Sequence, residues 1–114
     1  EYTRYGFHDM LEKKSADILM PDLERVGGVS EWLKVAHMAS AQDIPVSPHI
    51  FTEHSLQLCA AVSNVNYAEH MPWFTELFKE KMELVNGDII IPQRPGMSFS
   101  FDPDAVGRFT IPLP

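Results

Sequence analysis

The chain has 114 residues, of which 45% are hydrophobic and 22% are charged, an ordinary composition for a globular protein. Its formal net charge of −7 argues against nucleic acid or an anionic membrane surface as a partner. No apolar run approaches the roughly 18 residues that a membrane span needs, and residues 1–4 do not resemble a signal peptide. The single cysteine, Cys59, excludes an internal disulfide and favours the cytoplasm as the compartment.

Helical and extended patterns alternate through the first part of the chain. Three helices are expected, over residues 4–14, 30–43 and 52–62, and three strands, over residues 16–20, 44–49 and 65–69. Ser30 and Thr52 are expected to cap the second and third helices. The alternation predicts βαβ units and therefore an α/β fold with a parallel sheet.

The pattern changes after residue 71. Residues 73–78 predict one or two helical turns. Residues 83–91 predict a hairpin, because Asn86-Gly87 supplies the positive φ angles of a type I′ turn. Residues 97–101 alternate as a final strand. We therefore divide the chain into residues 1–71 and a closing segment, residues 72–114.

Three titratable residues follow three successive predicted strands: Asp22, His49 and Glu69. Neighbouring parallel strands lie about 4.8 Å apart, so side chains at the same level can touch. We expect Asp22 and His49 to hydrogen-bond at about 2.6–3.2 Å, with the carboxylate orienting the imidazole and raising its basicity. Glu69 would approach from the next strand. Ligands bind at this edge of parallel sheets, but spacing alone leaves open whether the three are catalytic or structural.

Several motifs resemble the mandelate racemase group of the enolase superfamily. They are Met20-Pro21-Asp22-Leu23-Glu24-Arg25-Val26-Gly27-Gly28-Val29, Ile44-Pro45-Val46-Ser47-Pro48-His49 and Tyr67-Ala68-Glu69. Residues 1–7 are similar to the segment that follows the last metal-binding glutamate in acid-sugar dehydratases of that group. Residues 91–101 are similar to the family's closing segment.

This resemblance implies the C-terminal part of a (β/α)₈ barrel of the TIM type in residues 1–71. It implies that His49, paired with Asp22, is the general acid/base and that Glu69 hydrogen-bonds the substrate carboxylate. Arg25, His49 and Glu69 are the expected substrate contacts, although Arg25 also fits a plain loop salt bridge. The implied reaction is Mg²⁺-dependent removal of the α-proton of a carboxylate, in the first place by an acid-sugar dehydratase. The alternatives are a racemase or epimerase of the same superfamily, or a non-catalytic fragment.

The chain departs from that family in what it lacks. The family's Lys-x-Lys motif, its three carboxylate metal ligands and its N-terminal capping domain have no counterpart here. We interpret Glu1 as lying just after the last ligand, so no metal ligand is expected in this chain. A complete barrel needs about 250 residues. We therefore expect a part of a larger enzyme that alone is inactive and binds Mg²⁺ weakly or not at all. We expect it to self-associate as a homo-oligomer through its open strand edges and through an exposed apolar face that carries Ile18, Met20, Val46 and Tyr67 or their alternates.

Overall fold

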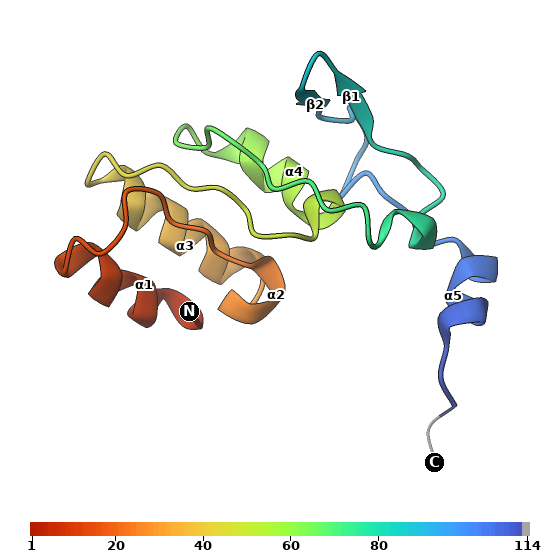
Figure 1. Ribbon diagram of the computed structural model, residues 1–114, viewed down its shortest axis with the longest axis horizontal. Helices are drawn as coiled ribbons and strands as arrows, with labels where there is room; N and C mark the ends of the chain where they lie inside the picture. Colours follow the sequence, from red (N-terminus) through yellow and green to blue (C-terminus); the bar gives the residue numbers. More distant parts are fainter. Residues whose placement is uncertain (113–114) are drawn as a thin grey trace.

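A computed structural model describes residues 1–112 of the chain (Figure 1). In chain order its elements are α1 (Thr3–Glu12), α2 (Leu23–Val26), α3 (Val29–Ser40), α4 (Thr52–Ala61), the 3₁₀ turn η1 (Thr75–Leu77), β1 (Glu83–Val85), β2 (Asp88–Ile90) and α5 (Pro103–Phe109). Within the described residues, no helix is long and apolar enough to cross a membrane.

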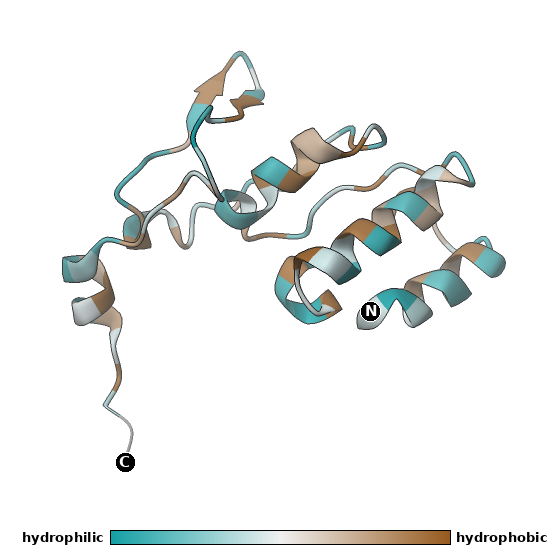
Figure 2. Ribbon diagram, turned by 180° about the vertical axis from the view of Figure 1, so that it is seen from behind, coloured by the Kyte–Doolittle hydropathy of each residue, from teal (hydrophilic) through white to brown (hydrophobic). Residues whose placement is uncertain are grey.

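Helices α1 and α3 pack against each other and carry most of the core. Apolar and polar residues alternate around both helices, as Figure 2 shows, which is the amphipathic pattern of helices with one buried face. Helical spacing predicts a buried stripe on α3 that consists of Trp32, Leu33, Val35, Ala36 and Ala39. Leu33 is only half-buried, and the other four are fully buried. Phe7 and Leu11 of α1 complete the core on that side.

The three predicted strands are present only as short extended segments. Single parallel bridges join Leu19 to Val46 and Val46 to Val65, and the three segments run side by side in Figure 1. The order and direction of the segments are as expected, but regular strands over residues 16–20, 44–49 and 65–69 were a wrong prediction. Pro45 and Pro48 remove two backbone donors from the middle segment, which limits the ladder to single bridges.

Both predicted helix caps were wrong. The N-cap of α3 is Gly28, and Ser30 lies inside the helix. The N-cap of α4 is Phe51, and Thr52 is the first residue of the helix. Its hydroxyl instead donates a hydrogen bond across the chain to the backbone carbonyl of Glu69, at 2.6 Å. The short helix α2 and the C-terminal helix α5 were not predicted.

The predicted hairpin is confirmed in the C-terminal part. β1 and β2 pair antiparallel, and Asn86 and Gly87 have φ angles of 53° and 93°. The predicted strand over residues 97–101 is reduced to one antiparallel bridge between Phe78 and Phe101. Ser98 has a positive φ of 69°, which interrupts an extended run. Helix α5 follows and projects away from the other helices (Figure 1).

The exposed apolar face expected along the segments is present in part. Ile18, Met20 and Tyr67 are 42%, 44% and 71% exposed. Val46, which was expected on the same face, is fully buried and belongs to the core with the helices. The reason is the register: Val46 is bridged to the buried Leu19, and bridged residues point to the same face, whereas Ile18 and Met20 alternate to the other face.

Candidate active site

Asp22, His49 and Glu69 lie together at the ends of the three extended segments. Asp22 and His49 each stand three positions beyond the bridged residue of their own segment, and Glu69 stands four positions beyond. His49 Nδ1 lies 3.0 Å from Asp22 Oδ2, so the predicted contact is confirmed. His49 Nε2 lies 4.0 Å from Glu69 Oε2. The equal offsets of Asp22 and His49 on parallel segments are the reason that the sequence could predict their contact.

Asp22 is held firmly from two sides. It is the N-cap of α2, and its Oδ1 accepts the backbone N–H groups of Glu24 and Arg25 at 3.0 and 2.9 Å. The preceding carbonyl, that of Pro21, accepts the buried indole N–H of Trp32 at 3.1 Å. Because Oδ1 is occupied by the helix, Oδ2 is the oxygen left for His49. Asp22 is only 4% exposed.

Burial and hydrogen bonding act in opposite directions on the Asp22 carboxyl. Burial raises its pKa, but the Arg25 N–H, the His49 ring, the Arg25 guanidinium and the Glu24 N–H together outweigh burial and leave the pKa below its ordinary value. Asp22 is therefore an ionised acceptor near neutral pH. An ionised carboxylate cannot donate, so His49 must donate through Nδ1–H. Its Nε2 lone pair is then free to take a proton.

Glu69 is held by the turn that follows His49. Its Oε2 accepts the backbone N–H of Ile50 at 2.9 Å. Its backbone carbonyl accepts the Thr52 hydroxyl, and its own N–H donates to the Pro48 carbonyl at 3.4 Å. Three polar groups from residues 48–52 thus bind Glu69, which lies on a different segment.

The same turn has an unusual backbone. Ile50 and Phe51 both have left-handed φ angles, 36° and 46°. Such angles cost of order 1–3 kcal/mol each for residues other than glycine, and they concentrate at functional sites. Here they let the Ile50 N–H reach the Glu69 carboxylate. The Phe51 ring stacks on Phe74, with centroids 4.6 Å apart, which holds the turn from the other side.

For Arg25 the sequence leaves two roles open, a substrate contact and a loop salt bridge. Its Nε lies 3.4 Å from Asp22 Oδ2, and its side chain is 55% exposed. The ion pair at the start of α2 is therefore present. A contact between Arg25 and substrate remains a prediction.

A second histidine–carboxylate pair lies nearby. His54 Nδ1 is 3.1 Å from Glu24 Oε1. This pair lines an almost wholly apolar cavity of about 270 Å³, together with the rings of Phe51, Phe74, Phe78 and Phe101. Unlike Asp22, Glu24 is exposed, so water competes for the contact. The pair makes His54 a matched comparison for His49.

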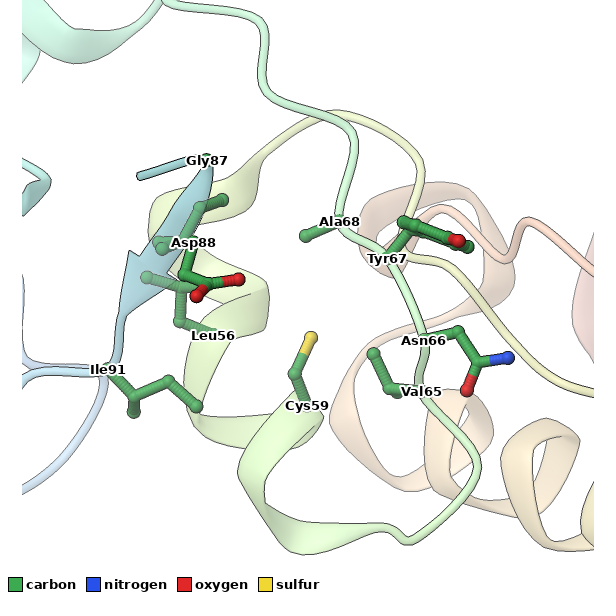
Figure 3. Close-up of a pocket in the computed structure, with 10 residues that line it drawn as sticks. Leu56, Cys59, Val65, Asn66, Tyr67, Ala68, Gly87, Asp88 and Ile91 are labelled. Atoms are coloured by element: carbon green, nitrogen blue, oxygen red, sulfur yellow. The ribbon is translucent and has the colours of Figure 1, made fainter. Parts of the chain in front are cut away.

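Another cavity is lined by none of the three site residues. It has a volume of about 490 Å³ and lies between α4, the segment Val65–Ala68 and the β1–β2 hairpin (Figure 3). Cys59 faces it from α4. Burial raises the pKa of the Cys59 thiol to about 11, so the thiol is protonated at neutral pH and is not a nucleophile.

The residues of this chain do not fit a magnesium site. Across residues 1–112, no three His, Cys, Asp or Glu side chains gather to hold a metal ion. Mg²⁺ requires several hard oxygen ligands in octahedral geometry. The Asp22 oxygens are already used by α2 and His49, and Glu69 Oε2 by Ile50. The three site residues are therefore suited to proton transfer and hydrogen bonding, and not to holding a magnesium ion by themselves.

Two contributors to the site escaped prediction from the sequence. Thr52 carries the local signature of a helix cap, since it is a threonine before a helical run. The Ile50 N–H is a backbone group, which no residue type indicates. Both act on Glu69, 17 and 19 residues away.

Comparisons with known proteins agree on one family. The family model described as enolase C-terminal domain-like matches residues 1–105. D-xylonate dehydratase of Haloferax volcanii is 37% identical over 114 residues, which cover 92% of this chain and 28% of the relative. D-galactarolactone cycloisomerase of Agrobacterium fabrum is 33% identical over 130 residues, covering 99% of this chain and 34% of the relative.

The solved structures give the same picture. L-talarate dehydratase from Polaromonas sp. JS666, complexed with Mg and L-glucarate, superposes with a TM-score of 0.88 and 31% identity. The match covers 94% of this chain and 30% of that protein. The chain thus spans between about a quarter and a third of the length of the relatives that it matches.

Proposed function

The chain belongs to the enolase C-terminal domain-like family, and from this we propose that it supplies the acid–base residues of a metal-dependent acid-sugar dehydratase. In that proposal residues 1–71 are the C-terminal part of a (β/α)₈ barrel, with three parallel segments and their helices. The main observation in its favour is the contact of His49 with Asp22, together with the distance of 4.0 Å between His49 Nε2 and Glu69 Oε2. The dehydratases among the relatives support the reaction class.

His49 is the proposed general base and acid. Asp22 fixes the ring with Nδ1–H as a donor, so Nε2 is the atom that takes a proton from the substrate's α-carbon or gives one to its leaving hydroxyl. Such groups contribute typically 10²–10⁴-fold to a rate. Removal of the α-proton and loss of the neighbouring hydroxyl as water together make a dehydration.

Glu69 is proposed to hydrogen-bond the substrate carboxylate as negative charge develops on it. Oε2 accepts the Ile50 N–H, so Oε1 is the oxygen available to the substrate, and a hydrogen bond between two carboxyl groups requires one proton between them. An α-proton of a carboxylate is too weakly acidic to remove unless that charge is stabilised. Arg25 is proposed as a further contact for the anionic substrate.

Magnesium is proposed for the whole enzyme and not for these residues alone. The related L-talarate dehydratase structure contains Mg. The ligands of such an ion would come from side chains outside this sequence. The ion would supply electrostatic stabilisation of the enolate charge.

The test is a matched pair of variants in the full-length protein that contains this chain, assayed with Mg²⁺ against a panel of acid sugars. His49→Asn is expected to lower kcat by about 10²–10⁴-fold. His54→Asn, which removes the other carboxylate-paired histidine, is expected to change kcat by less than about 3-fold, because its partner Glu24 is exposed. A His49→Asn variant with full activity would contradict the proposal.

A racemase, epimerase or cycloisomerase is the second candidate. The similarity to D-galactarolactone cycloisomerase over 99% of the chain favours it. Both functions start from the same proton transfer, so the product distinguishes them. A dehydratase product is lighter than its substrate by one water. An isomerase product has the mass of its substrate in ordinary water, and in D₂O a racemase or epimerase also incorporates deuterium at the α-carbon.

A further inference from the structure

We propose that Thr52 is a positioning residue that holds Glu69 in its working orientation beside His49. This inference rests on the proposed function, in which Glu69 contacts the substrate. The Thr52 hydroxyl donates its hydrogen bond to Glu69 and not to His49 or Asp22. In this proposal Thr52 therefore acts through Glu69.

The geometry of the contact is specific. Thr52 is 1% exposed, and its hydroxyl donates to the Glu69 carbonyl at 2.6 Å. The Ile50 N–H binds the carboxylate of the same residue at 2.9 Å. Glu69 is thus held at its backbone and at its side chain by two groups from one short turn, which leaves it little rotational freedom.

The turn itself explains why Thr52 is needed. The left-handed Ile50 and Phe51 raise the energy of this turn, so it persists only if contacts on both sides oppose its relaxation. Phe51 stacks on Phe74 on one side, and Thr52 binds Glu69 on the other. Without the hydroxyl, the Glu69 carbonyl loses its partner, and the turn loses one of the contacts that hold it beside the Ile50 N–H bond to Glu69 Oε2.

The first turn of α4 offers a matched control. Thr75 of η1 also donates its hydroxyl to the first turn of α4, to the buried carboxylate of Glu53 at 3.2 Å. That bond reaches the same end of α4 but does not involve Glu69. Thr75→Val therefore reproduces the loss of a hydroxyl contact to α4 without the proposed effect on Glu69.

The experiment compares Thr52→Val with Thr75→Val in the full-length enzyme. Thr52→Val keeps the shape of the side chain and is expected to lower kcat by about 10-fold or more, with KM within about 3-fold, since a misplacement near 1 Å can cost 10²-fold. Thr52→Ser keeps the hydroxyl and is expected to restore kcat to within about 3-fold of the parent. Thr75→Val is expected to lower the melting temperature but to leave kcat within about 2-fold.

A double-mutant cycle with Glu69→Gln separates the two proposals. If Thr52 acts through Glu69, Thr52→Val added to Glu69→Gln lowers kcat by less than about 2-fold further. A full additional loss, or a kcat effect in Thr75→Val equal to that in Thr52→Val, would overturn the positioning role. If Thr52→Val does not fold, Thr52→Ala takes its place against Thr52→Ser in the same cycle.

The remaining outcome concerns Glu69 itself. If Glu69→Gln leaves kcat unchanged, the proposed function of Glu69 fails and the positioning role with it. If Glu69→Gln lowers kcat and Thr52→Val does not, only the positioning role fails. Amide hydrogen exchange of Ile50 gives a readout apart from activity: it is expected to be about 10-fold faster in Thr52→Val than in Thr75→Val.

Discussion

Asp22 performs two tasks with its two oxygens. Oδ1 caps α2 through the N–H groups of Glu24 and Arg25, and Oδ2 binds His49. The residue that starts a helix is therefore also the residue that orients the candidate base. Removal of the Asp22 side chain would therefore affect both the start of α2 and the orientation of His49.

The first prediction separates these two tasks with Asp22→Asn. Asparagine caps helices as well as aspartate does, so the variant keeps the cap of α2 but loses the charge and the oxygen that accepts the His49 Nδ1–H. The pKa of Asp22 in the fold lies below its ordinary value of 3.8. The ionised carboxylate therefore stabilises the fold above about pH 3.8, and this stabilisation is lost as the pH falls through the lower folded-state value.

Urea unfolding of the purified chain between pH 3 and pH 7 would measure this. We expect Asp22→Asn to be less stable than the parent at pH 7, and the difference to shrink as the pH falls below about 4. Asp17→Asn, at a nearby exposed aspartate that has no hydrogen bond or ion pair within residues 1–112, is the control for the removal of one carboxylate charge. A difference that is constant over the whole range would rule out this role of the charge.

At the scale of elements, two glycines decide how α2 and α3 are joined. Gly27 ends α2 in the left-handed region, and Gly28 begins α3 with φ 90° and ψ −172°. The second conformation is essentially restricted to glycine. It lets α3 start within two residues of the end of α2, and Trp32 of α3 then reaches the Pro21 carbonyl beside Asp22.

The second prediction is therefore that Gly28→Ala destabilises the chain by about 1–3 kcal/mol. A Cβ at Gly28 would meet no atom within 4 Å, so any loss comes from the backbone alone. Gly107 in α5 is the matched control: its added Cβ would also meet nothing, and its φ is not in the left-handed region. Gly107→Ala is expected to be neutral or stabilising by up to about 1 kcal/mol. Equal effects in denaturant unfolding would refute the argument.

The whole molecule is less compact than its mass predicts. Its accessible surface is 7352 Å², whereas a compact monomer of 12.9 kDa exposes about 6300 Å². Its radius of gyration is 15.4 Å, against about 13 Å for a compact domain of this length. The extended segments carry exposed apolar side chains, among them Ile18 and Met20. Excess apolar surface of this kind favours association.

The third prediction is that the isolated chain self-associates, as expected from its sequence. Sedimentation velocity at micromolar concentration is expected to show dimers or larger species. Met20→Lys is expected to weaken the association, because it places a charge on an exposed edge segment. Val29→Lys, at an equally exposed apolar residue of α3, is expected to leave it unchanged. A cooperatively melting monomer at these concentrations would contradict the prediction.

Local and periodic patterns in the sequence were enough to predict one helix face, the hairpin and the contact between two of the site residues. The buried stripe of α3 follows from helical spacing, and the hairpin follows from Asn86-Gly87. The contact of His49 with Asp22 follows from their equal offsets on parallel segments. In each case the physical cause is a repeat or a turn preference that neighbouring residues carry themselves.

Only the tertiary structure decided the rest. The segments around Leu19, Val46 and Val65 form single bridges, because the length of a ladder depends on how segments that are far apart in the chain meet. Thr52 has the local signature of a cap, but its hydroxyl binds Glu69, 17 residues away. Every non-proline residue carries a backbone N–H, and that of Ile50 binds Glu69 only because the turn around it is left-handed. Contacts of this kind depend on how distant segments meet, which no local preference encodes.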